Sequence, residues 1–273
     1  MLGLVGHPVR HSLSPAMYNE LFRRSRIDAV YVAFDVHPER AGDVAGAIRA
    51  LDLVGVNLTV PFKERVMADL DHLTVAAEEA GAVNVVIQVE GKLTGYNTDG
   101  EGLVRSLEEQ GWSTRGRVAV VLGAGGTARA VASALVDRGA GRVCLLNRTE
   151  ARAVAAVDLL GRRFPGDRLE AGPLTPAAFA RLAAGADLVV NCLSGGAEQQ
   201  VCALSPEVLA PGGWWVDVNY WMPSPPLRAA ALARGLRFET GHAMLMHQGA
   251  LAFELFTGHP VEVREIREIL DTR

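Results

Sequence analysis

The sequence predicts an α/β protein of two domains, and three observations support this. The chain has 273 residues, more than a single domain usually holds. Its residues are 49% hydrophobic but only 6% aromatic, which suits helices packed on a sheet better than a β-sandwich. Apolar runs rich in Val, Ile and Leu alternate with longer segments of helical period, which is the pattern of βα units.

The first hundred residues contain one set of these units. The expected strands are apolar runs bounded by Gly or Asn: Leu2–Val5, Val30–Phe34, Gly55–Thr59 and Val83–Val89. Helices are expected at about Ser14–Arg24 and Arg40–Leu51, and a third after Pro61, because proline suits a first helical turn.

A second set follows a helical segment, Gly102–Gln110, and the polar stretch GWSTRGR, which is of the kind that joins domains. Its expected elements are Val118–Leu122, Thr127–Arg138, Val143–Leu146, Asp187–Asn191 and Trp214–Val218. No strand follows the last two expected helices, His247–Thr257 and Val263–Leu270, so we expect them to return to the first domain. The expected domains are therefore residues 1–101 with 240–273, and residues 102–239.

Charge and composition favour a small-molecule partner. The net charge is −4 and the 27 basic residues are scattered, which gives no footprint for nucleic acid or an anionic membrane. Three cysteines without ligand spacing signal neither a disulfide framework nor zinc. The apolar start is too short for a signal peptide, and no run of about 18 apolar residues exists. We expect a soluble cytoplasmic protein without a metal, and leave a homodimer open.

A glycine-rich turn marks the second domain as a nucleotide-binding unit. Gly123, Gly125 and Gly126 lie between a buried-type strand and an Ala-rich helix, and Ala128 takes the third close-packing position. Backbone N–H groups at such a helix start can meet a pyrophosphate, so we expect a Rossmann-like domain. A plain strand–helix turn is the alternative.

The next strand favours NADP over NAD. It ends in Asn147-Arg148-Thr149, where an NAD-binding protein usually has a carboxylate for the ribose 2′-hydroxyl. Arg148 and Arg152 are four residues apart at the start of a helix, so both can face one 2′-phosphate. The alternative is a pair of solvated arginines balanced by Glu150.

Three polar clusters, at 11–19, 55–63 and 81–102, interrupt the first domain. Each follows or ends a strand, and ligands in open α/β sheets bind beyond the carboxyl ends of strands, so we expect the clusters to converge on a cleft facing the nucleotide. Their hydroxyl and amide groups suit a polyhydroxylated substrate: Ser12, Ser14, Asn57, Thr59, Asn84 and Asn97. Taken singly, Ser14 is better explained as a helix N-cap before Pro15.

Lys63 and Asp99 are the candidate catalytic residues. Oxidation of a secondary alcohol sends a hydride to a nicotinamide and the hydroxyl proton to a base, and a lysine beside a carboxylate in a desolvated site can hold that proton. Taken singly, a lysine such as Lys63 at a helix start is more often a surface charge, and an aspartate such as Asp99 is more often a cap for the helix that follows it.

Several motifs together resemble the shikimate dehydrogenase family in order and spacing over nearly the whole chain: HSLSP, GVNLTVPFK, GAVN, GYNTDGEG, GAGGTARA, NRT and GHAMLMHQGALAFELFTG. The resemblance implies reversible reduction of 3-dehydroshikimate to shikimate with NADPH, a cytoplasmic step of aromatic amino-acid biosynthesis. It also implies that Lys63 and Asp99 are the acid–base pair.

The same resemblance assigns the binding residues. Ser12 and Ser14 would hold the substrate carboxylate, Thr59, Asn84, Asp99 and Gln248 its hydroxyls, with Tyr220 beside them. The NADP site would consist of Gly123, Ala124, Gly125, Gly126, Thr127, Asn147, Arg148, Thr149, Arg152 and Gly241.

Three departures from the family pattern lie near the expected ligands. Asn191-Cys192-Leu193 stands where Asn-Ala-Thr or Asn-Ala-Ser is usual, with Ser194 as a substitute hydroxyl, and Val85 stands where threonine is common. The loop from Tyr220 to Pro223 is one residue longer and carries Trp221 and Met222, which predicts a reshaped loop. An altered pocket shifts substrate preference, so a dehydrogenase of quinate or a related cyclic hydroxy acid is the alternative enzyme. A slow-turnover NADP- and ligand-binding sensor is the second alternative, against which the retained Lys63 and Asp99 argue.

Overall fold

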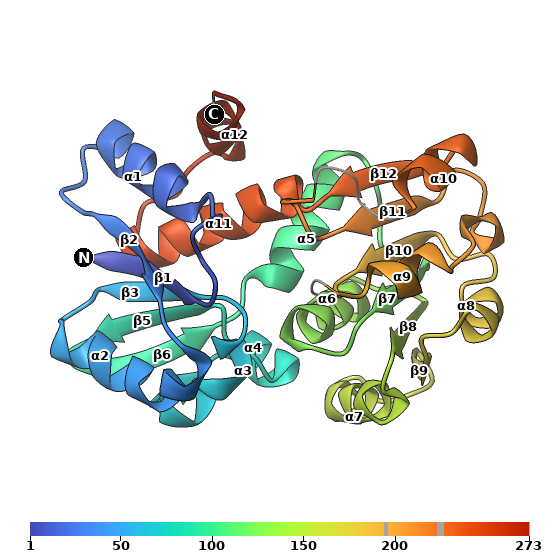
Figure 1. The fold of residues 1–273 in the computed structure, drawn as a ribbon, viewed down its shortest axis with the longest axis horizontal. Coiled ribbons are helices and arrows are strands. Elements are labelled where there is room, and N and C mark those ends of the chain that lie inside the picture. The colour runs from blue at the N-terminus through green and yellow to red at the C-terminus, as the bar shows by residue number, and fades with distance from the viewer. Residues whose placement is uncertain (194–195, 223–226, 273) are drawn as a thin grey trace. The chain divides into compact units, whose positions relative to one another are not determined.

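The structure is a computed structural model that describes residues 1–193, 196–222 and 227–272. It divides into two compact units (Figure 1). Unit 1 consists of Met1–Gly102 and Met246–Arg273, and unit 2 of Leu103–Leu245. The two boundaries between the units lie inside helices, α5 (Asp99–Glu109) and α11 (His242–Thr257). The sequence suggested boundaries near 101 and 240.

Unit 1 is built on a mixed sheet of six strands in the order β2-β1-β3-β5-β6-β4. Their bounds are β1 Leu2–Gly6, β2 Tyr31–Asp35, β3 Gly55–Leu58, β4 His72–Leu73, β5 Val85–Val89 and β6 Lys92–Tyr96. Strand β1 pairs in parallel with β2 and β3, so the loops that follow these three strands leave from the same edge of the sheet. β5 runs antiparallel to both β3 and β6.

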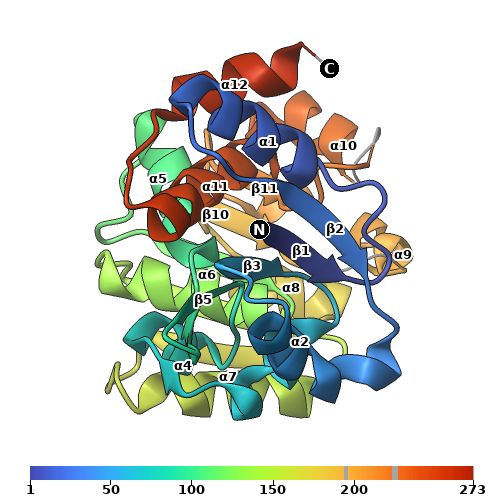
Figure 2. The ribbon, with the colours of Figure 1, turned by 90° about the vertical axis from the view of Figure 1, so that its left-hand side faces the viewer.

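Helices cover both faces of this sheet (Figure 2). On one face, α2 (Val44–Ala50), α3 (Phe62–Arg65) and α4 (Val75–Ala80) bury apolar side chains against alternate strand positions such as Val56 and Val86. On the other, α1 (Ser14–Ser25) and α11 share an aromatic cluster, in which Phe22 stacks on Phe253 with ring centroids 5.7 Å apart. The last helix, α12 (Val263–Asp271), packs on α1, where Arg24 pairs with Glu268.

Unit 2 is a fully parallel sheet of six strands in the order β12-β11-β10-β7-β8-β9. Their bounds are β7 Val118–Leu122, β8 Arg142–Asn147, β9 Leu169–Pro173, β10 Leu188–Asn191, β11 Trp214–Asp217 and β12 Arg237–Thr240. Because the order reverses between β7 and β10, the carboxyl end of β7 is the topological switch point, where dinucleotides bind in this fold class.

Both faces of the parallel sheet are buried. Helices α6 (Gly126–Asp137) and α7 (Glu150–Gly161) cover one face together with α5. Helices α8 (Pro176–Leu182), α9 (Glu198–Cys202) and α10 (Arg228–Ala233) cover the other. Central strands buried on two sides need apolar residues at every position, which accounts for runs such as VAVVL in β7. Across the described residues, no helix combines the length and apolarity needed to cross a membrane.

The α/β fold class predicted from the sequence is confirmed, and most differences concern short or polar elements. The sequence analysis did not identify β4, β6, β9 and β12, which are short and rich in polar residues or Gly and Pro. The helix expected over 40–51 is a 3-10 segment, Pro38–Asp43, followed by α2, because Arg40 departs from helical backbone angles.

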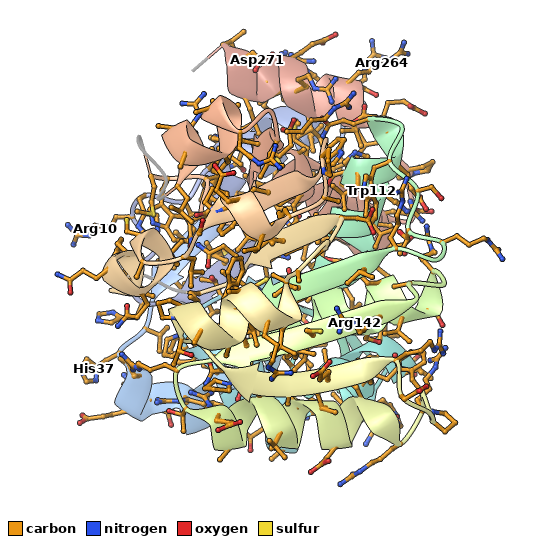
Figure 3. The ribbon with its side chains drawn as sticks, turned by 90° about the vertical axis from the view of Figure 1, so that its right-hand side faces the viewer. Arg10, His37, Trp112, Arg142, Arg264 and Asp271 are labelled. Carbon is orange, nitrogen blue, oxygen red and sulfur yellow. The ribbon has the colours of Figure 1, made fainter. Side chains whose placement is uncertain are left out.

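The polar stretch GWSTRGR does not join the two units. Trp112 and Thr114 are 7% and 3% exposed, and Trp112 packs into the core of unit 2 with α5 (Figure 3). The interpretation of this stretch as a linker is therefore wrong, because the apolar face of α5 and the residues after it already belong to the second core.

Asp71 ties β6 to α2 at one end of the unit 1 sheet. Its carboxylate accepts the Leu93 N–H at 2.8 Å, Arg49 at 2.7 Å and Lys92 at 3.3 Å. The backbone bond from Leu93, followed by the Arg49 guanidinium, holds the pKa of Asp71 well below its ordinary value. A depressed pKa means that the folded protein binds the ionised form better than the unfolded chain does.

We therefore expect Asp71→Asn to lower the melting temperature at pH 7. The contribution of Asp71 is fully present above about pH 4, the ordinary aspartate value, and is lost as the pH falls through the lower pKa of the folded state. The difference in melting temperature between variant and wild type should shrink steadily below pH 4. A difference that stays constant from pH 7 to pH 2.5 would show that the charge of Asp71 is not what stabilises this corner.

Candidate active site and nucleotide site

Lys63 and Asp99 form an ion pair in unit 1. Nζ of Lys63, in α3, donates to Oδ2 of Asp99, the first residue of α5, at 2.5 Å. The side chains are 18% and 6% exposed, so neither lies free on the surface. The Lys63 carbonyl accepts the N–H of Val83 at 2.7 Å, which anchors the lysine backbone to the segment before β5. The pair is thus held by elements that are distant in sequence, and the interpretation of Lys63 as a surface charge is wrong.

Asp99 is the first residue of α5 and not the cap that precedes it, and its carboxylate bonds within unit 1. The Asp99 N–H donates to Oδ1 of Asn97 at 3.0 Å, so Asn97 binds the first N–H group of the helix. Nδ2 of Asn97 in turn donates to the Ala82 carbonyl at 2.9 Å. The Asp99 carboxylate accepts hydrogen bonds from Lys63 and Asn84. These bonds replace the hydration that a buried charge loses.

Asn84 links four polar groups of this site. Its Nδ2 donates to Oδ1 of Asp99 at 2.8 Å and to Oγ1 of Thr98 at 2.9 Å, with Oε1 of Gln248 further away at 3.5 Å. Its Oδ1 accepts the N–H of Thr98 at 2.8 Å. Since Asn84 is only 2% exposed, its orientation is fixed by these bonds and not by solvent.

A glycine allows Gln248 to reach this group. A Cβ on Gly102 would lie 2.6 Å from Cβ of Gln248 and 2.8 Å from its backbone N, so only glycine permits α5 and α11 to approach this closely. Thr98 Oγ1 donates to the backbone and side-chain oxygens of Gln248 at 3.3 and 3.4 Å. Four of the residues assigned from the resemblance, Lys63, Asn84, Asp99 and Gln248, are therefore joined in one hydrogen-bonded group.

The serines lie after β1, on the same edge of the sheet as Thr59, which follows β3. Helix α1 begins at Ser14 with Leu13 as N-cap, so the interpretation of Ser14 as an N-cap is wrong. Oγ of Ser12 accepts the N–H of Ser14 at 3.2 Å. Arg10, in the same loop, is exposed and projects outward, as His37 does after β2 (Figure 3).

The glycine turn of unit 2 follows β7, at the switch point of the sheet. Gly123 has a φ of +116°, a conformation that residues with a side chain rarely adopt. Gly125 precedes α6, which begins at Gly126 and presents its first N–H groups at this end of the sheet. Nη1 of Arg129 donates to the Ala124 carbonyl at 2.8 Å and holds the turn against the helix. The turn is an anion cradle at the position where a dinucleotide pyrophosphate fits.

The end of β8 suits a phosphate rather than a ribose hydroxyl. Arg148 and Arg152 are exposed, and among the described residues Glu150 forms no ion pair with either guanidinium. Nδ2 of Asn147 donates to the Thr149 carbonyl at 2.9 Å and shapes the turn between them. Two cations that Glu150 does not neutralise fit the 2′-phosphate that distinguishes NADP from NAD.

A buried carboxylate organises the ends of β10 and β11 and was not singled out from the sequence. Asp217 is fully buried and accepts Nδ2 of Asn191 at 2.9 Å and both N–H groups of Asn219, at 3.0 Å from the backbone and 2.8 Å from the side chain. Asn219 also donates to the Leu193 carbonyl at 3.0 Å. The segment Asn191-Cys192-Leu193, which differs from the usual family pattern, is thus held by hydrogen bonds to side-chain amides and Asp217. The sequence signal that could have found it was the pair of polar residues ending two apolar strands.

Two further assigned residues lie at this end of unit 2. A Cβ on Gly241 would meet the Val218 carbonyl oxygen at 2.1 Å, so the turn from β12 into α11 requires glycine. The Tyr220 ring contacts His242 and Trp221, with centroids 5.5 and 5.2 Å apart. Ser194 and residues 223–226, which include Pro223 at the end of the loop expected to be reshaped, lie outside the described residues. Val85, the third departure, is fully buried in the sheet.

Together these features define the class of protein: a two-unit α/β oxidoreductase with a Rossmann-type unit for a phosphorylated dinucleotide. Family profiles agree with it. Residues 4–86 match the shikimate dehydrogenase substrate binding domain, 106–198 the shikimate/quinate 5-dehydrogenase domain, and 241–270 the shikimate 5′-dehydrogenase C-terminal domain.

Individual relatives match over nearly their whole length. The chain is 45% identical to a shikimate dehydrogenase (NADP⁺) of Symbiobacterium thermophilum, covering 96% of this chain and 91% of that one. A relative of the same name from Moorella thermoacetica is 42% identical, covering 99% and 92%. The crystal structure of shikimate 5-dehydrogenase from Thermus thermophilus in complex with NADP(H) and shikimate is 39% identical, with a TM-score of 0.85 and coverage of 99% and 98%. The chain belongs to the shikimate dehydrogenase family.

We expect Gly102→Ala to destabilise the protein by about 1–3 kcal/mol, because the added methyl group would overlap with Gln248 in a packed helix contact. Gly46→Ala is the matched control. Gly46 lies within α2, is exposed, and would have no atom within 4 Å of its new Cβ. That change should stabilise by about 0.5–1 kcal/mol through helix propensity. Urea unfolding measures both, and an equal gain at the two positions would contradict the close approach of α5 and α11.

Proposed function

We propose that this protein catalyses the reversible NADP-dependent oxidation of shikimate to 3-dehydroshikimate. The observation that carries the proposal is the Lys63–Asp99 pair, joined through Asn84 and Thr98 to Gln248 in a chain of the shikimate dehydrogenase family. A proton-transferring cation surrounded by groups that recognise hydroxyls suits a polyhydroxylated substrate. Free cysteines at 144, 192 and 202 support the cytoplasmic location that we include in the proposal.

The substrate-binding roles follow from the chemistry of each group. The hydroxyls of Ser12 and Ser14 donate to the substrate carboxylate. Thr59, Asn84 and Gln248 hydrogen-bond the ring hydroxyls, together with the Asp99 carboxylate, and Tyr220 completes the recognition. Amide and hydroxyl groups held in fixed orientations reject analogues that lack the matching hydroxyl, because their own buried polar atoms would then be unpaired.

Lys63 moves the proton. In the direction of reduction, the carbonyl carbon of 3-dehydroshikimate gains a hydride while its oxygen takes a proton from Nζ of Lys63, which gives the alcohol. In the direction of oxidation, the neutral amine takes that proton back from the hydroxyl. Asp99 orients the amine through its 2.5 Å contact and stabilises the ammonium form. Bound NADPH supplies the hydride, and bound NADP⁺ accepts it.

The nucleotide-binding roles are assigned to unit 2. Backbone N–H groups of Gly123, Ala124, Gly125, Gly126 and Thr127 bind the pyrophosphate. Arg148 and Arg152 bind the 2′-phosphate, with Asn147 and Thr149 shaping the turn that presents them. Gly241 is assigned to the same NADP site from the family resemblance.

The direct test is nicotinamide reduction by the purified protein with shikimate or quinate, each with NADP⁺ and with NAD⁺. We expect shikimate with NADP⁺ to give the highest kcat/KM. Lys63→Ala should lower kcat by about 10²–10⁴-fold, the usual contribution of a general acid or base, with the Kd for NADP⁺ unchanged. Arg65→Ala, which removes an exposed cation from the same helix, is the control and should retain activity. Preference for quinate, or nucleotide binding without turnover, would overturn the proposal.

Arg148→Ala should weaken NADP⁺ binding about tenfold to a hundredfold, since a charge-assisted bond contributes roughly 1.5–3 kcal/mol. NAD⁺ lacks the phosphate, so its Kd should stay the same. Arg162→Ala, just beyond the other end of α7, removes another cation and should change neither Kd. Titration calorimetry with both nucleotides provides the comparison. Equal losses for NADP⁺ and NAD⁺ would give Arg148 a structural role instead.

A further inference from the structure

Two buried tyrosines lie behind the residues of the active site. Tyr18 in α1 and Tyr31 at the start of β2 are each 1% exposed, and their rings stack with centroids 4.5 Å apart. Phe256 contacts both rings edge-on. Buried hydroxyls need hydrogen-bond partners, so the atoms that these two hydroxyls bind are informative.

The Tyr31 hydroxyl is the start of a chain of bonds that reaches Asn84. Oη of Tyr31 donates to Oδ1 of Asn57 at 2.7 Å, and Nδ2 of Asn57 donates to the Asn84 carbonyl at 3.3 Å. That carbonyl also accepts the N–H of Leu58 at 2.9 Å. The side chain of Asn84 then continues to Asp99, and Asp99 to Lys63. The proton-transferring pair is therefore connected to a tyrosine that does not belong to the active site.

Tyr31 itself is rigidly held. Its N–H donates to Oδ1 of Asn19 at 2.9 Å, and its carbonyl accepts Nδ2 of Asn19 at 2.8 Å. One side chain of α1 thus binds both backbone groups of Tyr31, on a strand at the edge of the sheet. Because both backbone groups of Tyr31 are bound and its ring is packed, its hydroxyl is held in one place.

The direction of the Tyr31 bond selects the orientation of the Asn57 amide. With Oδ1 facing Tyr31, Nδ2 faces the Asn84 carbonyl and can donate to it. With the amide turned over, Oδ1 would oppose that carbonyl oxygen, two acceptors without a proton between them. Tyr18, which stacks on Tyr31, has a separate partner: its hydroxyl donates to the Gly249 carbonyl at 3.2 Å, beside Gln248.

We propose that Tyr31, acting through Asn57, is a positioning residue that sets the place of Asn84 and therefore the geometry of Asp99 and Lys63. The inference rests on the proposed function for its kinetic consequence. The acid–base pair is thereby connected through two asparagines, Asn84 and Asn57, to the buried hydroxyl of Tyr31. Neither Tyr31 nor Asn57 needs to touch the reacting atoms for this role.

The kinetic test uses three variants and a control. Tyr31→Phe removes only the hydroxyl, and Asn57→Leu removes both amide groups at similar volume. Each should lower kcat/KM for shikimate by about tenfold or more, since small displacements of acid–base groups slow catalysis strongly. The Kd for NADP⁺ should not change. The double variant should lose no more than Asn57→Leu alone, because both changes break the same chain.

Ile48→Val is the matched control for buried volume. Ile48 belongs to α2 and is 1% exposed in the core beneath that helix, away from these bonds, so this variant should keep kcat/KM within about twofold of wild type. Additive losses in the double variant, wild-type kcat/KM in Tyr31→Phe, or a parallel loss of NADP⁺ affinity would each overturn the inference.

A second measurement does not depend on the substrate. Asn84 accepts the amide protons of Leu58 and Thr98, so Tyr31→Phe should speed hydrogen exchange at both, and Ile48→Val should not. Unchanged exchange at Leu58 and Thr98 in Tyr31→Phe would contradict the positioning role. If the wild-type protein failed to oxidise shikimate, the proposed function would fall, while the exchange rates would still decide whether Tyr31 positions Asn84.

Discussion

The ion pair between Lys63 and Asp99 is the constraint on which unit 1 depends. A carboxylate that is nearly inaccessible to water loses hydration that must be replaced, and a single lysine does not supply enough donors. Asn84 provides the next bond to Asp99, and Asn97 fixes the backbone from which the carboxylate projects. The polar residues around the pair are therefore required by the charge that they surround, besides any contact that they make with a substrate.

This requirement explains why the site draws on segments so far apart in sequence. Lys63 comes from α3, Asp99 from α5 and Gln248 from α11. Gly102 allows α11 to bring Gln248 against α5, since any side chain at that position would displace Gln248. Behind the pair, the stacked tyrosines bury their rings in the aromatic cluster beneath α1 and α11 and direct their hydroxyls toward the site. The two tyrosine side chains therefore both fill the core and form hydrogen bonds with buried polar groups.

Unit 2 has a different arrangement, in which backbone N–H groups and exposed cations lie at the carboxyl ends of the strands. Its parallel sheet brings a glycine turn and a helix start to the switch point, where backbone N–H groups are already oriented. Arg148 and Arg152 are exposed, so neither guanidinium carries the desolvation cost of a buried charge. The buried Asp217 accepts its bonds from the amides of Asn191 and Asn219, which organises the neighbouring loop without introducing a cation.

The sequence predicts Lys63 and Asp99 as the acid–base pair, and by itself it determined the fold class, the glycine turn and the preference for a phosphorylated nucleotide. These are local properties, because periodicity, turn chemistry and a missing carboxylate can be recognised within a few residues. Short polar strands such as β6 and β12 were missed, since their pairing comes from neighbouring strands and not from their own composition. The tertiary structure alone decided which polar side chains are joined. Asn97 binds the first N–H group of α5, and Tyr31 reaches Asn84 through Asn57, because hydrogen-bond partners are chosen by proximity in the folded chain, which sequence spacing does not encode.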